Sequence, residues 1–218
     1  MFRRNMSDEA PVFETTTGPV RVITAASLFD GHDAAINVMR RLIQSSGAEV
    51  IHLGHDRSAK DVVDCAVQED AHAVALTSYQ GGHMEYFTYI RQLLDEAGCA
   101  HVRIFGGGGG TITPPEIRDL HKSGISRIYS PDDGRKMGLM GMIHDLMGTA
   151  SEVDLISDDR LASLEGPITA DDMAKVGLLL TMSESASDED FKAMVEKVRS
   201  SDKDVPVIGF TGTGGAGK

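Results

Sequence analysis

Short apolar runs alternate along most of the chain with longer segments in which apolar residues recur every three or four positions. The short runs are rich in Val, Ile and Ala and read as strands at residues 20–25, 49–53, 73–77, 102–105 and 127–129. The longer segments have the period of an amphipathic helix at residues 33–46, 59–69, 84–97, 114–123 and 135–147. This pattern predicts five successive β–α units, as in a parallel sheet covered by helices.

Turn residues fall where these helices are predicted to end. Gly47, Gly98 and Gly124 stand at positions where a helix carboxyl end favours a left-handed residue. Five β–α units with right-handed crossovers are most simply arranged as an α/β, flavodoxin-like, doubly wound parallel sheet of order 2-1-3-4-5. In that order, ligands bind at the carboxyl ends of the first and third strands.

The predicted organisation has four parts. They are a flexible tail at residues 1–18, the α/β domain at 19–148, a helical linker at 149–203 and the truncated start of another domain at 204–218. The linker is acidic and has helical periodicity at 170–182 and 188–200. An apolar run at 205–210 is expected to form the first strand of the final part.

Charge, apolar run length and cysteine spacing disfavour nucleic-acid-binding, membrane and secreted proteins. The net charge of −12 and the pI near 5.0 disfavour nucleic acid as a partner. The apolar runs are too short to cross a membrane, so no membrane association is expected. Cys65 and Cys99 form no CxxC pair and follow no secretory leader, which favours a reduced, cytoplasmic setting.

The first predicted strand runs into a loop with candidate metal chemistry. Asp30-Gly31-His32-Asp33 falls at the carboxyl edge of the sheet, beside the predicted switch point. There, the Asp30 carboxylate could hold the Nδ1 proton of His32 and leave Nε2 for a metal. The same spacing is also common in loops that cap the following helix.

Two further loops are rich in glycine. The third strand leads into Thr77-Ser78-Tyr79-Gln80-Gly81-Gly82-His83, and the fourth leads into the run from Gly106 to Gly110. Five consecutive glycines lose conformational entropy on folding without filling a core. The run therefore predicts a sizeable ligand that passes close to the backbone.

Together, these loops resemble the cobalamin-binding domain of the methylmalonyl-CoA mutase and methionine synthase group over residues 20–147. The pattern of that domain is Asp-x-His-x-x-Gly, then Ser-x-Leu, then Gly-Gly. Ala35 stands here for the glycine, Thr77 for the serine and Tyr79 for the leucine. The departures leave His32 unchanged and imply a differently shaped pocket for the nucleotide tail of the cofactor.

The resemblance implies residue roles. His32 would be the lower axial cobalt ligand and Asp30 its partner, Ser78 would contact the tail, and Gly107 and Gly108 would line its channel. The expected cofactor-binding residues are Asp30, Gly31, His32, Asp33, Ser78, Tyr79, Gln80, Gly81, Gly82, His83, Gly106, Gly107, Gly108 and Gly109.

The carboxyl end carries a second motif. Its residues, which follow an apolar run, are Gly212, Thr213, Gly214, Gly215, Ala216, Gly217 and Lys218. They match a Walker A loop, whose backbone amides cradle phosphates and whose lysine reaches the β- and γ-phosphates. The motif's magnesium-binding serine or threonine is not among these residues, so the fragment is not expected to hydrolyse a nucleoside triphosphate.

The residues of the first three loops, Asp-Gly-His-Asp-Ala-Ala, Ser-Tyr-Gln-Gly-Gly-His and the five-glycine run, are similar to those of the fused isobutyryl-CoA mutases, in which a cobalamin domain precedes a GTPase domain and an acyl-CoA-binding barrel. The Walker A motif supports this resemblance independently. This likeness implies adenosylcobalamin as cofactor, GTP and Mg²⁺ for the intact parent, isomerase and hydrolase activities, and a homodimer. The fragment itself would bind cobalamin without turning over substrate.

Other interpretations stay open. The domain could serve as a cobalamin sensor or carrier, or as part of a methylmalonyl-CoA mutase-type subunit. A receiver-like signalling domain shares the strand order, but it would need an aspartate where Ser78 and Tyr79 stand. His52 and His55 form an H-x-x-H on the far side of the switch point, where a metal role is not expected.

Overall fold

The computed structural model describes residues 13–169, 171–198, 209 and 211. Its central parallel sheet consists of β3 (Arg21–Ser27), β4 (Glu49–Arg57), β5 (Ala73–Thr77), β6 (Arg103–Gly107) and β7 (Arg127–Tyr129). The strands lie in the order β4-β3-β5-β6-β7, which is the predicted order 2-1-3-4-5. The predicted flavodoxin-like, doubly wound sheet is therefore confirmed.

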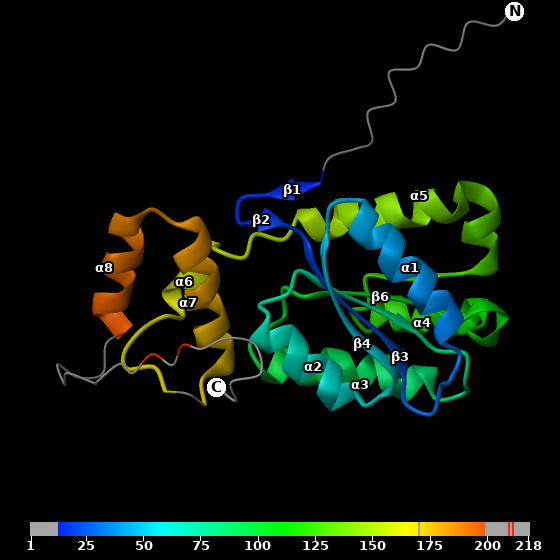
Figure 1. The fold of residues 1–218 in the computed structure, drawn as a ribbon. Coiled ribbons are helices and arrows are strands. Elements are labelled where there is room, and N and C mark those ends of the chain that lie inside the picture. The colour runs from blue at the N-terminus through cyan, green and yellow to red at the C-terminus, as the bar shows by residue number, and fades with distance from the viewer. Residues whose placement is uncertain (1–12, 170, 199–208, 210, 212–218) are drawn as a thin grey trace, which may run out of the picture.

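Helices cover both faces of the sheet (Figure 1). One face carries α1 (Asp33–Ser45) and α5 (Pro131–Ser151), and the other carries α2 (Ala59–Gln68), α3 (His83–Glu96) and α4 (Pro114–Lys122). Two buried apolar clusters lie between these layers. Alternate residues of β5 belong to the two clusters. Ala73 and Ala75 pack with α1 and α5, and Val74 and Leu76 pack with the helices of the other face.

Helix α5 begins earlier than residue 135, where the sequence predicts its start. Ser130 and Asp133 form a capping box, in which Ser130 Oγ accepts from the Asp133 N–H and the Asp133 carboxylate accepts from the Ser130 N–H. Gly138 interrupts the helix with φ 68°. The predicted boundary between residues 148 and 149 falls inside α5, because Ala150 is still buried in the domain core.

The segment before the sheet is ordered from residue 13. Residues 13–18, which the sequence assigns to a flexible tail, include β1 (Glu14–Thr15), which pairs antiparallel with β2 (Gly18–Pro19). The ring of Phe13 lies 5.8 Å from that of His144 on α5. This hairpin is therefore attached to the main domain.

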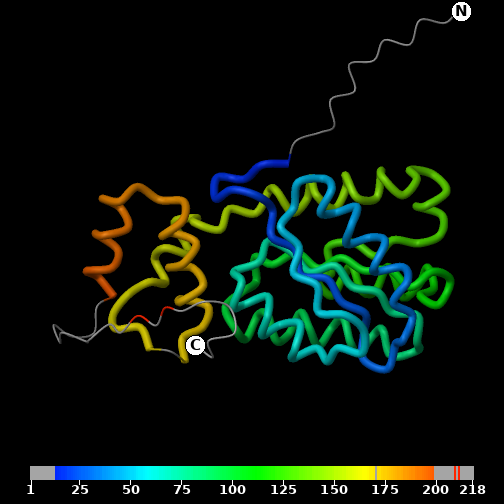
Figure 2. The backbone as a smooth tube through the Cα atoms, in the orientation of Figure 1, coloured from blue at the N-terminus to red at the C-terminus, as the bar shows by residue number. Residues whose placement is uncertain are grey.

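Three more helices form a separate group beside the sheet (Figures 1 and 2). They are α6 (Asp158–Ala162), α7 (Met173–Ser185) and α8 (Asp188–Val198). Their own buried cluster contains Leu164, Leu178, Met182, Met194 and Val198. Helix α7 approaches α2 so closely at Gly177 that an added Cβ would lie 2.8 Å from the Val67 carbonyl oxygen.

A buried polar network joins this helical group to the amino edge of the sheet. Asp70 is 3% exposed, and its Oδ1 accepts from Arg160 Nη2 at 2.6 Å while its Oδ2 accepts from Thr181 Oγ1 at 2.7 Å. Arg21 Nη2 donates to the same Thr181 hydroxyl at 2.7 Å. The described part of the predicted linker is thus anchored to the α/β domain.

In the part of the chain that the structure describes, no helix has the length and apolar character to cross a membrane. Cys65 and Cys99 are both free thiols. The predicted strand at 205–210, apart from Gly209, and the nucleotide-binding residues 212–218 lie outside the described residues.

Candidate functional site

A buried carboxylate organises the loop after β3. Asp30 is 1% exposed, and its Oδ1 accepts from the backbone N–H of His32 at 2.9 Å and from His32 Nδ1 at 2.8 Å. Its Oδ2 accepts from the backbone N–H of Tyr79 at 2.6 Å. Since β3 and β5 are neighbours in the sheet, this one side chain ties their two loops together.

These contacts favour the ionised form of the Asp30 carboxyl. Burial alone would raise the pKa of the Asp30 carboxyl, but the hydrogen bonds from the Tyr79 and His32 amides outweigh it and hold this pKa below its ordinary value. The ionised carboxylate then keeps a proton on His32 Nδ1, so that Nε2 carries the lone pair. The His32 side chain is 75% exposed, which makes Nε2 accessible to a metal.

The alternative interpretation of this loop as a helix cap is wrong. His32 occupies the N-cap position of α1, and neither its side chain nor any other makes a side-chain cap hydrogen bond there. Asp30 bonds to His32 and to Tyr79 of another loop rather than to the first turn of α1. The Asp30 carboxylate therefore orients His32 and does not cap α1.

The loop after β5 separates two hydroxyls. Ser78 is fully buried, where it receives a hydrogen bond from Ser27 Oγ at 2.9 Å, so its side chain turns inward. Thr77 Oγ1 is buried without a hydrogen-bond partner among the described residues, and Thr77 lines a cavity. Thr77 was absent from the predicted site set, although the alternation along β5 puts it on the face of Ala73 and Ala75.

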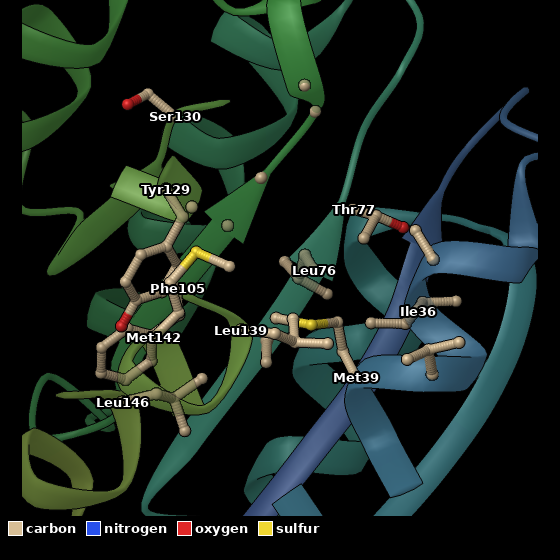
Figure 3. Close-up of a pocket in the computed structure, with 18 of the residues that line it drawn as sticks. Ile36, Met39, Leu76, Thr77, Phe105, Tyr129, Ser130, Leu139, Met142 and Leu146 are labelled. Carbon is tan, nitrogen blue, oxygen red and sulfur yellow. The ribbon is translucent and has the colours of Figure 1, made fainter. Parts of the chain in front are cut away.

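An apolar cavity of about 490 Å³ lies between α1, the ends of β5 and β6, and the start of α5 (Figure 3). Figure 3 shows Ile36 and Met39 on one side, and Tyr129, Met142 and Leu146 on the other. Its further lining residues include Thr77, Tyr79, Phe105, Leu139 and the glycines from Gly106 to Gly109. The cavity can hold a flat apolar group, and the Thr77 hydroxyl is available to it as a hydrogen-bond donor or acceptor.

Packing within the protein, and not only space for a ligand, requires glycine at several positions of the glycine run. A Cβ on Gly106 would collide with the Phe87 ring, and one on Gly108 would collide with the Ser78 carbonyl oxygen. Gly109 has φ 57°, which favours glycine. A Cβ on Gly107 would make an ordinary van der Waals contact with the Tyr129 carbonyl oxygen, and one on Gly110 would have no atom within 4 Å, so these two positions have no steric need for glycine within the protein.

The other predicted site residues divide into two groups. Gly31, Asp33 and Gly81 are exposed on the loops around His32. Gln80 instead bridges loops, since its Nε2 donates to the Leu28 carbonyl at 3.2 Å and its Oε1 accepts from the Gly82 N–H at 2.8 Å.

His83 is buried at the start of α3, where its Nδ1 lies 3.3 Å from the Gln80 carbonyl oxygen. Its side chain is 4% exposed, and its Nε2 is 3.3 Å from Glu116 Oε2 at the start of α4. The Glu116 carboxylate also accepts hydrogen bonds from the backbone and side chain of Thr113, which lower its pKa. His83 therefore joins the starts of two helices.

The H-x-x-H on β4 does not form a metal centre in the described structure. His52 Nδ1 lies 2.9 Å from Thr24 Oγ1, and burial together with the nearby Arg40 charge lowers its pKa. Within the described residues, no group of three or more histidine, cysteine, aspartate or glutamate side chains is arranged to hold a metal ion.

The chain is similar to proteins of known activity. It is 50% identical over 208 residues to a "Fused isobutyryl-CoA mutase" from Geobacillus kaustophilus, which covers 91% of this chain but 19% of that protein. It is 31% identical to the "2-hydroxyisobutanoyl-CoA mutase small subunit" of Aquincola tertiaricarbonis, over 52% of this chain and 82% of that subunit. The chain thus spans about a fifth of the length of the fused relatives.

A solved structure shares the fold. It is a cobalamin-binding protein from Desulfitobacterium hafniense, with a TM-score of 0.50, 18% sequence identity, and coverage of 60% of this chain and 58% of that one. The family model described as "B12 binding domain" matches residues 20–132, which hold all three loops of the site. The chain therefore belongs to the B12-binding domain family.

Proposed function

We propose that this chain binds adenosylcobalamin with His32 Nε2 as the lower cobalt ligand and with the nucleotide tail of the cofactor in the apolar cavity. The observation that carries the proposal is the position of the Asp30-held His32 beside a cavity lined by Thr77, whose buried hydroxyl has no hydrogen-bond partner among the described residues. Dimethylbenzimidazole, the base of the tail, has a flat apolar body and a ring nitrogen that can accept a hydrogen bond from Thr77. The residues present therefore fit the cofactor.

The chain contributes binding and orientation. Asp30 holds the Nδ1 proton of His32, which fixes the tautomer and makes Nε2 a better ligand. Ile36, Phe105 and Leu146 give the cavity an apolar wall that excludes water from the tail. Bound adenosylcobalamin supplies the radical chemistry of a carbon-skeleton rearrangement.

For the intact parent, we propose an acyl-CoA mutase that interconverts isobutyryl-CoA and n-butyryl-CoA. The names of the most similar relatives support this activity, and their greater length leaves room for a GTPase domain and an acyl-CoA-binding barrel. The Walker A sequence that ends at Lys218 supports GTP and Mg²⁺ as ligands of the next domain. A homodimer in the cytoplasm is part of the same proposal.

The test is to mix the 218-residue chain with adenosylcobalamin and to record its visible spectrum and dissociation constant. The wild-type protein is expected to bind the cofactor with its own base displaced. His32→Ala should lose the histidine ligation and weaken binding by at least about tenfold. His52→Ala is the matched control, since that histidine contacts Thr24 on the sheet, and its binding should equal that of the wild type.

Nitrogen labelling identifies the ligand directly. After reduction to the cob(II)alamin form, the electron paramagnetic resonance spectrum carries hyperfine splitting from the axial nitrogen. Labelling histidine with ¹⁵N should change this splitting in the wild-type protein and have no effect in His32→Ala. A wild-type chain that fails to bind, or a splitting that ignores the label, would refute the proposal.

A further inference from the structure

Tyr79 touches all three loops of the proposed cobalamin site. Its backbone N–H donates to Asp30 Oδ2 at 2.6 Å, and its carbonyl accepts from Thr111 Oγ1 at 3.4 Å. Its ring lies 5.6 Å from the His32 ring, centroid to centroid, with the planes inclined by 47°. Tyr79 is therefore the residue at which the cobalt-ligand loop, the β5 loop and the glycine loop meet.

The same ring also borders the cavity. An added Cβ on Gly109 would lie 3.2 Å from Tyr79 Cε1, so the glycine run leaves room for the ring. Tyr79 itself lines the cavity and is half-buried. The ring thus lies next to the His32 imidazole and also borders the space in which the tail is proposed to lie.

The imidazole needs such a neighbour. The His32 side chain is 75% exposed, and its Nδ1 is hydrogen-bonded to the Asp30 carboxylate. That contact restrains one edge of the ring, whereas a side chain that must be immobilised on binding lowers affinity by about twofold to tenfold. An aromatic ring packed beside the imidazole removes part of this freedom before the ligand arrives.

We infer that Tyr79 is a positioning residue, whose ring pre-orients His32 for the cobalt and forms part of the wall of the tail cavity. This inference rests on the proposed function and adds a specific requirement for an aromatic side chain. The general sequence pattern has leucine at this position, which lacks a flat ring. Tyr79→Leu and Tyr79→Phe therefore separate side-chain bulk from ring geometry.

Adenosylcobalamin titrations of the 218-residue chain test the inference. Tyr79→Leu is expected to raise the dissociation constant about threefold to tenfold, while Tyr79→Phe stays within about twofold of the wild type. Tyr89→Leu is the matched control, because Tyr89 is half-exposed on α3, and it should match the wild type. Equal affinities for Tyr79→Leu and the wild type overturn the inference, as does an equal loss in Tyr79→Phe.

A cofactor-free measurement guards against a variant that fails to fold. In the wild-type chain and in Tyr79→Phe, nuclear Overhauser effects between the ring protons of residue 79 and the His32 imidazole are expected. Their absence in the folded wild-type protein overturns the inference without reference to any variant. If the wild-type chain binds through His32 but Tyr79→Leu binds equally well, this inference fails while the proposed function stands.

Discussion

Asp70 at the amino edge of the sheet and Asp30 at its carboxyl edge are both buried carboxylates, yet they hold different partners. Asp70 bonds to Arg160 and Thr181, which are themselves nearly buried and belong to α6 and α7. Asp30 bonds to His32, whose other nitrogen lies on an exposed side chain. All the partners of Asp70 lie within the protein, so its network stabilises the fold. The Asp30 network instead leaves His32 Nε2 available to a ligand.

The hydroxyls show the same difference. Thr181 Oγ1 donates to Asp70 and accepts from Arg21, so its hydrogen-bonding capacity is used inside the protein. Thr77 Oγ1 is also buried but has no hydrogen-bond partner among the described residues. A buried polar group without a hydrogen-bond partner destabilises the folded protein by about 1–3 kcal/mol. In a binding site, a ligand can supply the missing hydrogen bond, whereas in a structural core nothing does.

The largest expected effect comes from breaking the network at the amino edge. Asp70→Asn removes the charge but keeps a residue that tolerates the left-handed backbone there, where φ is 46°. It leaves the buried Arg160 guanidinium without its counter-charge, and the free energy of unfolding should fall by about 3 kcal/mol. Chemical denaturation measures this loss, and adenosylcobalamin affinity should stay at the wild-type value.

Asp119→Asn is the control for this substitution. Asp119 pairs with Lys122 on the surface of α4, where both side chains are more than half exposed. Such a pair contributes little, so stability should change by less than about 0.5 kcal/mol. If Asp70→Asn were as mild as Asp119→Asn, the amino-edge network would not be what anchors the helical group.

The second prediction concerns pH. Burial, followed by the Arg21 charge, lowers the pKa of His72 to about 4, and its Nδ1 accepts from the Arg21 N–H. Because the unfolded state keeps the ordinary pKa of 6.5, it binds more protons than the folded state between pH 6.5 and pH 4. The stability contributed by neutral His72 is therefore present above pH 6.5 and is lost as the pH falls, by about 2 kcal/mol at pH 5.

Denaturation midpoints at pH 7 and pH 5 measure this loss. His72→Asn offers an amide oxygen near the position of Nδ1 and does not titrate, so its stability should depend less on pH than that of the wild type. His55→Asn, on an exposed part of β4, should keep the full wild-type dependence. An unchanged slope in His72→Asn would mean that the acid sensitivity arises elsewhere, for example at His101, whose pKa is also lowered to about 4 by burial.

The contacts at the two edges of the sheet differ in how far apart their partners lie in the sequence, and this separation decides which of them the sequence predicts. The Asp30-to-His32 pair lies within one loop, and the strand order follows from five local β–α units, so both can be predicted. The partners of Asp70 lie 90 and 111 residues away in sequence, on helices that no local pattern places against the sheet. The amino-edge network is therefore seen only in the folded structure.

The choice between Thr77 and Ser78 could have been made from the sequence. Side chains alternate along a strand, so Thr77 shares a face with Ala73 and Ala75, beneath α1 and α5. The prediction named Ser78 from the resemblance to the cobalamin-binding family and did not use the alternation along the strand. The glycine run was explained by a ligand alone, whereas Gly106 and Gly108 are also required by Phe87 and by the Ser78 backbone.

The smallest expected effect on stability is the one that separates the two edges most sharply. Thr77→Val keeps the side-chain shape and removes an unpaired buried hydroxyl, so the free energy of unfolding should stay equal or rise by up to about 1 kcal/mol. If the hydroxyl bonds to the cobalamin tail, the dissociation constant should rise about threefold to tenfold. Denaturation and visible titration of the same sample measure the two quantities.

Thr181→Val makes the same chemical change at the other edge and should have the opposite result. It removes the hydroxyl that links Asp70 with Arg21, so the protein should lose about 1–3 kcal/mol of stability while the folded fraction binds adenosylcobalamin normally. Destabilisation by Thr77→Val would show that its hydroxyl has a partner within the protein. The two substitutions are chemically identical. Changes of opposite sign in the free energy of unfolding would therefore reflect the different surroundings of the two hydroxyls, one paired within the protein and the other available to a ligand.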